Sequence, residues 1–212
     1  MTDEIIQGSD AWKQLRLGKV TASRVADVVA RTKSGYGAAR ANYAAQLIAE
    51  RLTGVPAESY TNAAMQHGTD TEPEARAAYE FYQGASVHEI AFIAHPKIEQ
   101  AVCSPDGLVD TDGLVEIKCP NTATHLETLL GQAVPSKYEA QMQFQMACTG
   151  RAWCDFVSYD PRMPENMRLF VRRIARDDRR INELETEVAA FLLELAVKLS
   201  QLNSLYGLET AA

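Results

Sequence analysis

Asp106, Glu116 and Lys118 are the residues of this sequence whose types and spacing best suit chemistry. They lie in SPDGLVDTDGLVEIKCP, residues 104–120, on either side of an Asp-Gly turn signal. Two neighbouring carboxylates repel each other unless a cation lies between them, and hard divalent ions prefer oxygen ligands. The pattern therefore predicts a Mg²⁺ site formed by Asp106, Glu116 and the main-chain carbonyl of Ile117.

Lys118 adds a positive charge beside this predicted metal site. It follows Glu116 by two residues, so both side chains project from the same face of a strand. An ammonium group there can orient a metal-activated hydroxide and stabilise the charge that develops when the hydroxide attacks phosphorus. The alternative is an exposed hairpin with an ordinary Glu-Lys pair, and the short pattern alone fits both interpretations.

The turn must bring Asp106 to the face that carries Glu116 and Lys118. We expect a three-residue loop at 111–113, with Gly113 in the left-handed conformation. In that register residue 108 lies opposite 116 and residue 106 lies opposite 118, so all three side chains share one face. A two-residue loop would send Asp106 to the other side of the sheet.

Helices and strands outside this segment must hold the hairpin in place. Apolar periodicity and helix formers predict helices, whereas β-branched and aromatic runs predict strands. The expected helices are a short one around Val25, then 38–53 ending at Gly54, 62–83 disturbed near Pro73, 136–149 and 177–202. The expected strands lie within 85–95, 101–120, 152–160 and 167–175. This order predicts an α/β fold, with a central mixed β-sheet flanked by helices.

Two of these helices carry further signals. Ser136 and Glu139, directly after Pro135, have the spacing of a capping box, which predicts the start of the helix at 136. The last helix places apolar residues on one face, which we interpret as a core face rather than a partner-binding stripe. These residues are Leu184, Val188, Phe191, Leu195, Leu199 and Leu202.

Length and composition limit the class of protein. The chain has 212 residues, 46% of them hydrophobic, and we expect a single domain over 1–212. Its first residues lack the basic and apolar regions of a signal peptide, so we expect a soluble, cytoplasmic protein without membrane contact. The four cysteines have no zinc-binding spacing, which predicts reduced and mostly buried thiols.

Basic residues are unevenly distributed in a chain whose formal net charge is −7. Residues 11–51 hold eight Lys and Arg side chains against Asp27 and Glu50, and a second basic group extends over 168–180. An acidic protein with such strips can hold nucleic acid along one path and repel it elsewhere. Solvated helix faces are the alternative explanation of the same pattern.

Several stretches taken together resemble the lambda-type phage exonucleases, YqaJ-like alkaline exonucleases of phage recombination within the PD-(D/E)XK nuclease superfamily. The resemblance covers most of the chain from residue 10 to about 175, with the blocks in family order. These blocks are AWKQLRLGKVTAS, GTDTEPEAR, CSPDGL, LVEIKCP, YEAQMQFQM and YDPRM. The resemblance implies a restriction-endonuclease-like nuclease core.

The resemblance also assigns roles to individual residues. Asp106 and Glu116 match the family's metal ligands, Lys118 matches its catalytic lysine, and Glu72 matches the helix glutamate that completes an acidic cluster for two metal ions. A terminal 5′-phosphate would be held by a second group, in which a guanidinium, hydroxyls and an amide supply donors. This group consists of Arg16, Ser23, Ser104 and Gln141.

Other DNA contacts are implied less directly. Met65 occupies the position of an apolar wedge that helps to split the duplex end, and Ala63 replaces a basic residue that the family has there. Lys33, in the segment RTKSGYG, could supply a minor-groove or phosphate contact, although a solvated loop lysine fits equally well. Tyr138 lies one helical turn before Gln141. It either holds the Gln141 side chain in position or has only a packing role.

By resemblance, the chain is expected to be a Mg²⁺-dependent exonuclease, with Mn²⁺ as a substitute metal. It would bind double-stranded DNA ends, degrade the 5′-phosphorylated strand from 5′ to 3′ into mononucleotides, and leave 3′ single-stranded tails. A toroidal homotrimer, a single-strand annealing protein as partner, and a phage or prophage origin in a bacterial host are also implied. The alternatives are another PD-(D/E)XK endonuclease, a helicase-associated nuclease, or a non-catalytic module that binds DNA ends.

Overall fold

The computed structural model describes residues 5–57 and 63–207, and the side chains of 63–65 lie outside the description. Its helices are α1 (Asp10–Arg16), α2 (Val25–Val29), α3 (Ala38–Thr53), α4 (Ala63–Gln83), α5 (Thr122–Gly131), α6 (Ser136–Thr149) and α7 (Asp178–Tyr206). Short 3₁₀ helices lie at Ala22–Arg24 and Glu165–Met167. The strands are β1 (Val20–Thr21), β2 (Arg31–Thr32), β3 (Gly35–Tyr36), β4 (Val87–His88), β5 (Ile93–Ala94), β6 (Ala101–Cys103), β7 (Gly107–Val109), β8 (Gly113–Lys118), β9 (Trp153–Tyr159) and β10 (Leu169–Ala175).

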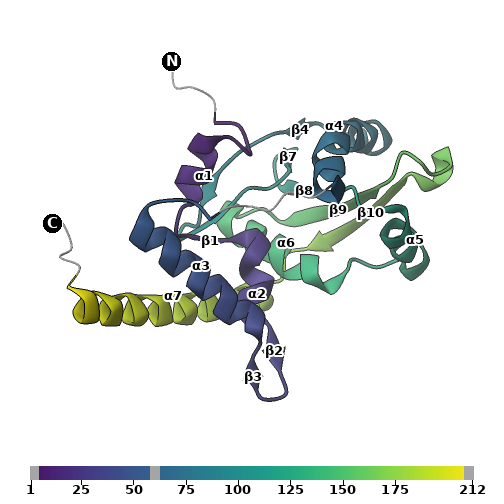
Figure 1. Cartoon of the computed structure of the whole chain (residues 1–212). Helices are drawn as coiled ribbons and strands as arrows, with labels where there is room; N and C mark the ends of the chain where they lie inside the picture. The colour runs from purple at the N-terminus through teal and green to yellow at the C-terminus, as the bar shows by residue number, and fades with distance from the viewer. Residues whose placement is uncertain (1–4, 58–62, 208–212) are drawn as a thin grey trace.

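A five-stranded mixed sheet in the order β10-β9-β8-β7-β4 forms the centre of the fold (Figure 1). Strands β8 and β9 run parallel, and the other neighbouring pairs in this sheet are antiparallel. A smaller sheet, β1-β6-β5, lies beside it, and β2-β3 forms a separate hairpin. The mixed α/β architecture with flanking helices was predicted correctly.

Helices α4 and α6 cover opposite faces of the central sheet. Val115 and Ile117 of β8 pack in one cluster with Ala75 and Tyr79 of α4. Their neighbour Leu114 packs instead in a cluster with residues of α6, β9, β10 and α7. Because side chains alternate along a strand, Glu116 and Lys118 lie on the face of β8 that Leu114 shares, toward α6.

The loop of the β7-β8 hairpin differs from the expected one. Val109 pairs with Gly113, so the three-residue loop is 110–112. The residue with positive φ is Asp110, at 45°, and Gly113 belongs to β8. The predicted loop position and register were therefore wrong. Extension of the observed register places Asp106 opposite Glu116 rather than Lys118, and this even shift leaves Asp106 on the same face.

Gly113 is required by packing rather than by the turn. It pairs with Trp153 of β9, and a Cβ atom built on it would lie 2.1 Å from carbons of the indole ring. The Asp-Gly dipeptide at 112–113 is therefore a misleading turn signal, because the glycine makes room for an aromatic ring.

Gly113→Ala should lower the free energy of unfolding by about 1 to 3 kcal/mol, since the new methyl group overlaps the ring of Trp153. Urea denaturation followed by circular dichroism measures this change. Gly131→Ala is the matched control, because a Cβ atom there meets no atom within 4 Å. Equal urea midpoints for Gly113→Ala and Gly131→Ala would show that the Trp153 side chain moves away from the new methyl group without loss of stability.

Helix α6 begins where it was expected, but the capping box is absent. Pro135 is the N-cap residue, no side chain caps the helix, and Ser136 is the first helical residue. Glu139 instead forms an ion pair with Arg180 of α7, with 3.4 Å between the Oε2 and Nε atoms. The ring of Pro135 fixes its φ angle directly before the first helical residue.

Helix α7 lies along the edge of the molecule and contributes one face to the core (Figure 1). Asp177 caps it, accepting hydrogen bonds from the backbone of Arg179 and Arg180. Within the described residues it alone has the length and composition of a membrane-spanning helix. Its buried face and its ion pairs with the protein body favour a packed helix instead. The predicted core positions 184, 188, 191 and 195 are buried, whereas 199 and 202 are only partly buried.

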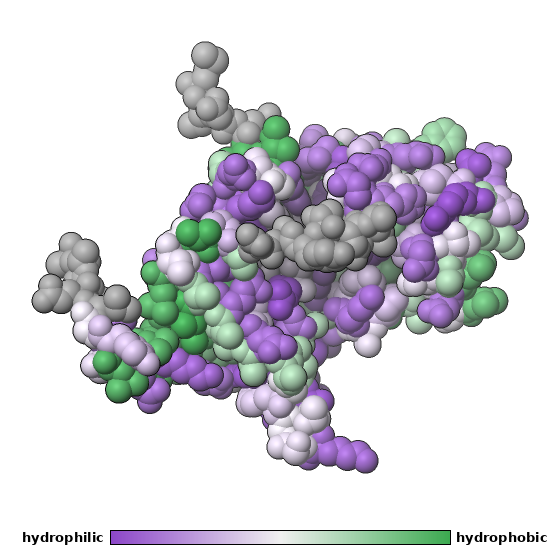
Figure 2. Space-filling model, viewed as in Figure 1, coloured by the Kyte–Doolittle hydropathy of each residue, from purple (hydrophilic) through white to green (hydrophobic). Residues whose placement is uncertain are grey.

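Hydrophobic side chains gather at the end of the molecule where α3 and α7 lie (Figure 2). Leu193 and Val197 of α7 are 70% and 58% exposed, and Leu52 and Val55 at the end of α3 are also exposed. All four cysteines are buried free thiols, as expected from their spacing.

Candidate active site

Strand β8 and the turn before β7 bring the three predicted catalytic side chains together. Asp106 precedes β7 directly, and its Oδ2 atom accepts a 2.6 Å hydrogen bond from the main-chain nitrogen of Ile117. Ile117 lies between Glu116 and Lys118 on β8, so this bond fixes Asp106 beside both.

Glu116 is fully buried and is surrounded by donors. Gln141 Nε2 donates to its Oε1 atom and Gln145 Nε2 donates to its Oε2 atom, each at 2.6 Å. The ammonium group of Lys118 forms an ion pair with Oε1. Because Gln141 and Gln145 are one turn apart on α6, this helix holds both oxygens of the carboxylate in fixed positions.

The pKa of the Asp106 carboxyl is raised well above its usual value, first by burial and then by the charge of Glu116. Lys118 and the hydrogen bond from Ile117 act in the opposite direction. One buried and one partly buried carboxylate therefore lie together, with Lys118 as the cation that offsets their charge on Asp106. A divalent cation would relieve this repulsion.

The pKa of Lys118 reflects the same competition. Burial alone would lower it, but the charges of Glu116 and Asp106 and the hydrogen bond to Glu116 outweigh burial and raise it. Lys118 is therefore a fixed positive charge at neutral pH. Its Nζ atom lies 5.4 Å from the centre of the Tyr138 ring, which in turn stacks on Phe156. Tyr138 thus packs beside the lysine.

Glu72 approaches the same site from α4. A Cβ atom built on Gly68 would lie 3.9 Å from the carbonyl oxygen of Cys119, so α4 passes close to the end of β8. Burial raises the pKa of Glu72, the charges of Arg76 and Lys118 lower it, and Glu116 raises it. Arg76 Nη2 pairs with Glu72 Oε1 at 2.8 Å and holds the carboxylate in place.

The donor set fits a hard divalent ion. Within residues 5–57 and 63–207, no three His, Cys, Asp or Glu side chains are close enough to form a complete protein-only metal site. Mg²⁺ does not need one, because it commonly keeps several waters and binds through one or two carboxylates plus substrate phosphate oxygens. Asp106 and Glu116 supply that pair, and the ammonium of Lys118 shows that a cation is accommodated beside them.

Arg16 and Ser104 form a second polar centre close to the carboxylates. Arg16 Nη1 donates to Ser104 Oγ at 2.8 Å, and Ser104 precedes Asp106 by two residues. Trp12 Nε1 donates to the same hydroxyl at 3.0 Å, and the Arg16 guanidinium lies 4.0 Å from the centre of the indole ring. Burial lowers the pKa of Arg16, and none of its described hydrogen bonds or ion pairs is to a carboxylate. Such a guanidinium suits an anionic ligand.

The four predicted phosphate-binding residues are only partly brought together. Ser23 lies in the 3₁₀ helix at 22–24, within hydrogen-bonding distance of the Thr21 hydroxyl, and it lines the same cleft as Arg16. Gln141 is bound to Glu116 and thus belongs to the carboxylate site in this structure.

Lys33 lies away from this centre. Lys33 is exposed in the loop between β2 and β3, a hairpin that projects from the body (Figure 1). Met65 is in the first turn of α4, but its side chain lies outside the described residues, so its predicted wedge role stays a prediction.

Three residues of the site were missed in the sequence, although each has a helical signal. Trp12 precedes Arg16 by four residues, Arg76 follows Glu72 by four, and Gln145 follows Gln141 by four. Residues at this spacing are neighbours on a helix surface, so each could have been found as the partner of a residue already chosen.

Comparisons with known proteins agree with this architecture. Residues 11–152 match the model of the YqaJ-like viral recombinase domain. The alkaline exonuclease LHK-Exo from Laribacter hongkongensis, solved alone and in complex with dAMP, is 54% identical, with a TM-score of 0.87 over 92% of this chain and 97% of that one.

A phage-related exonuclease from Haemophilus somnus 129PT is 17% identical and has a TM-score of 0.72 over 87% of this chain and 96% of that one, which supports the fold. The curated proteins contain no match to this sequence. The family match covers well over half of the chain, and the LHK-Exo identity extends across nearly all of it. The chain therefore belongs to the YqaJ-like viral recombinase family, and its fold is that of the alkaline exonucleases.

Proposed function

We propose that this chain, as one domain, is a Mg²⁺-dependent exonuclease that degrades the 5′-phosphorylated strand of a DNA duplex from its end. The observation that carries the proposal is that Arg16 is hydrogen-bonded to Ser104, two residues before Asp106, whose carboxyl interacts in turn with the charges of Glu116 and Lys118. One centre suits a terminal phosphate, and the adjoining centre suits the hydrolysis of a phosphodiester. The 54% identity with an alkaline exonuclease makes the enzyme an exonuclease, and the proposal adds its metal, polarity, substrate end and products.

The carboxylates and the lysine would divide the chemical work. Asp106 and Glu116, with the carbonyl group of Ile117, would hold Mg²⁺ or Mn²⁺, and Glu72 would complete the site for a second ion. The bound metal supplies Lewis acidity and a water of lowered pKa. Lys118 would orient that nucleophile toward phosphorus and stabilise the negative charge that develops on the phosphate oxygens. Gln141 and Gln145 keep Glu116 oriented throughout.

The phosphate centre would set the polarity of digestion. A terminal phosphate carries close to two negative charges at neutral pH, whereas an internal phosphodiester carries one. Arg16 with Ser23 and Ser104 would prefer the terminal group, and Gln141 would reach it only after release from Glu116. A 5′-phosphate held there places the next phosphodiester at the carboxylates. Each cleavage would then release a mononucleotide and leave a new 5′-phosphate, producing 3′ single-stranded tails.

Digestion of linear duplexes labelled at either end, with and without 5′-phosphate and with and without Mg²⁺, tests this function. We expect metal-dependent release of 5′-mononucleotides from the 5′-phosphorylated strand. Release of internal fragments would instead indicate an endonuclease. Binding to ends without any hydrolysis would indicate a non-catalytic module, against which the clustered Asp106, Glu116 and Lys118 argue.

We further propose that three copies form a ring around DNA in the host cytoplasm, in a phage-type recombination system with a single-strand annealing protein. Closed rings of identical subunits require an interface that joins different surfaces of neighbouring copies. The exposed Leu193 and Val197 of α7 provide an apolar surface of the kind that often lies at interfaces. Lys33, on the projecting β2-β3 hairpin, and Met65 would contact the enclosed duplex.

Light scattering should give the mass of a trimer, about three times 23.4 kDa. Leu193→Glu should shift the protein toward smaller species, because it places a charge in the apolar surface. Leu130→Glu is the matched control, since Leu130 is 85% exposed on α5, far from α7 in sequence. A monomeric wild-type protein that still digests long DNA without release would rule out the ring.

A further inference from the structure

A groove of about 660 Å³ lies between the N-terminal segment, α4 and the loop that joins β4 to β5. Its lining includes one residue from each centre of the candidate site. Trp12 donates a hydrogen bond to Ser104 of the phosphate centre, and Glu72 belongs to the carboxylate site. Trp12 also lines the cleft that holds Arg16. The groove therefore begins where the two centres meet.

Gln7 ties the wall of this groove to the backbone of the site. Its Nε2 atom donates to the carbonyl oxygen of Pro105 at 3.0 Å and to that of Ile90 at 3.1 Å. Pro105 lies between Ser104 and Asp106, so it separates the two centres along the chain. Because one side chain binds both carbonyl groups, the Ile90 wall is held beside the segment that carries both centres.

The lining of the groove is mostly uncharged. Of its twelve described residues three are charged, and Arg76 pairs with the other two, with Glu72 at 2.8 Å and with Glu89 at 2.6 Å. One positive and two negative charges give this groove no excess positive charge to attract a phosphate. Its apolar lining residues are Ile5, Ile6, Trp12, Pro73, Ile90 and Ala91. Such a lining suits a neutral group with apolar faces.

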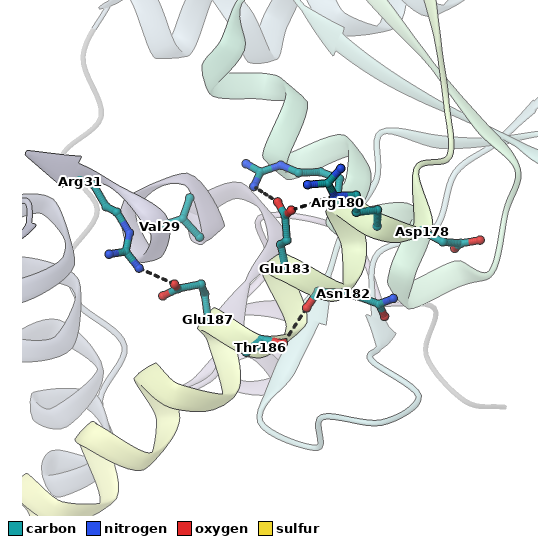
Figure 3. A pocket seen from close by; sticks show the side chains of 9 residues that line it. Val29, Arg31, Asp178, Arg180, Asn182, Glu183, Thr186 and Glu187 are labelled. Atoms are coloured by element: carbon teal, nitrogen blue, oxygen red, sulfur yellow. Dashed lines mark hydrogen bonds and ion pairs between the residues drawn. The ribbon is translucent and has the colours of Figure 1, made fainter.

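The larger groove at the start of α7 provides a contrast (Figure 3). It measures about 900 Å³, and six of its nine lining residues are charged. Arg31 pairs there with Glu187 at 2.6 Å, and Arg180 pairs with Glu183 at 3.3 Å. Its described lining includes no residue of either centre. A mostly uncharged lining beside both centres is therefore a property of the smaller groove.

The parts of a nucleotide indicate what would enter the smaller groove. In the proposed function Arg16 and Ser104 hold the 5′-phosphate of the terminal nucleotide, and the phosphodiester on the other side of its sugar lies at Asp106. The sugar then spans the two centres, and the base is the one part that neither centre holds. A nucleobase is flat, aromatic and uncharged at neutral pH, so apolar side chains and an indole ring can bury its faces.

We propose that this groove is a base subsite, which holds the nucleobase of the 5′-terminal nucleotide against Ile6, Ile90 and Trp12. This inference rests on the proposed function, because the phosphate centre must hold the other end of the same nucleotide. A base bound in the groove would fix the sugar between the centres. The phosphodiester to be cleaved would then be held at a constant position relative to the carboxylates.

Calorimetric binding of dAMP and of its abasic analogue 1,2-dideoxyribose 5-phosphate to the full chain, without divalent metal, tests the subsite. Both ligands have the sugar ring and the phosphate, but only dAMP has a base. dAMP should bind about 10-fold more tightly, which is the scale of the contribution from stacking one base. Ile6→Ser and Ile90→Ser should each lower the affinity for dAMP by about 3-fold or more and leave the affinity for the abasic analogue unchanged.

Ile6 is 70% exposed, so its substitution leaves the fold intact. Leu130→Ser is the matched control, because Leu130 is another exposed aliphatic residue and lies outside the lining of the groove. It should bind both ligands as the wild-type protein does.

Equal affinity of the wild-type protein for the two ligands, with both still dependent on Arg16, would overturn the base subsite and leave the proposed function intact. A full 10-fold difference in both isoleucine variants would also overturn it, because the base would then bind outside this groove. Binding of dAMP that is unaffected by Arg16→Ala would instead contradict the phosphate centre, and the placement of the base with it.

Discussion

Asp106→Ala is expected to abolish hydrolysis of linear duplex DNA while the protein stays folded. The substitution removes one carboxylate of the proposed metal pair, together with the hydrogen bond from Ile117. Glu116→Gln and Lys118→Ala should have effects of the same order, a rate loss of about 10² or more, because each removes charge needed by the metal or the transition state. Release of acid-soluble nucleotide measures the rate of hydrolysis. Calorimetric titration with Mg²⁺ shows whether a variant is slow because it no longer binds the metal or because it no longer supports the reaction.

Asp110→Asn is the control for the Asp106 experiment. Asp110 belongs to the same hairpin, is exposed and has a positive φ that asparagine tolerates. It should retain wild-type activity. Near-normal turnover by Lys118→Ala would contradict the role given to the lysine, and unchanged Mg²⁺ affinity in Asp106→Ala would contradict the proposed metal pair.

Arg16→Ala should lose most of the preference for a 5′-phosphorylated end. Arg16 is a half-buried guanidinium bound to the Ser104 hydroxyl rather than to a carboxylate, so its charge is available to a ligand. Wild-type protein should digest a 5′-phosphorylated duplex much faster than the 5′-hydroxyl form. Arg16→Ala should digest the phosphorylated duplex more slowly than wild type does, and the 5′-hydroxyl duplex at nearly the wild-type rate. Removal of a charged hydrogen-bond partner predicts a loss of about 10-fold or more. The two rates are compared in both proteins at fixed salt.

Arg16→Lys distinguishes charge from shape in this experiment, because lysine cannot form two parallel hydrogen bonds with phosphate. It should recover only part of the preference. Arg179→Ala, in the second basic group, should behave as wild type. Full phosphate preference in Arg16→Ala would place the phosphate centre elsewhere. The second basic group, whose arginines along 172–180 contact carboxylates or carbonyl oxygens in this structure, would then be the next region to test.

The sequence predicted the main helices and the mixed sheet because their signals are local. The range 38–53 agrees with α3 at both ends, since Gly54 takes the left-handed cap conformation there. The predictions failed where a contact with a residue distant in the sequence determines the local structure. Gly113 carries a turn signal, but Trp153, which lies 40 positions further along the chain, uses the space above it. The hydroxyl of Ser136 suits a cap, but Pro135 already occupies the cap position.

The candidate site shows the same limit. Asp106, Glu116 and Lys118 could be chosen from a hairpin of local contacts, and α4 adds Glu72 where the resemblance implied it. The amide partners of Glu116 lie on α6 and could not be chosen from the hairpin alone. In this structure the packing of α6 on the sheet directs Gln141 to Glu116 together with Gln145, and the phosphate contact of Gln141 stays a prediction. Only the tertiary arrangement determines which of two nearby anions an amide group contacts.

The contact between Trp12 and Arg16 gives the proposed phosphate centre an optical label. The chain has two tryptophans, and Trp153 lies apart from this centre, against Gly113 and the Arg173 guanidinium. With Trp153 replaced by phenylalanine, indole emission would come from Trp12 alone, whose ring lies 4.0 Å from the guanidinium carbon of Arg16. Occupation of the centre can then be followed in real time by fluorescence, turnover by turnover, without a dye on either the protein or the DNA.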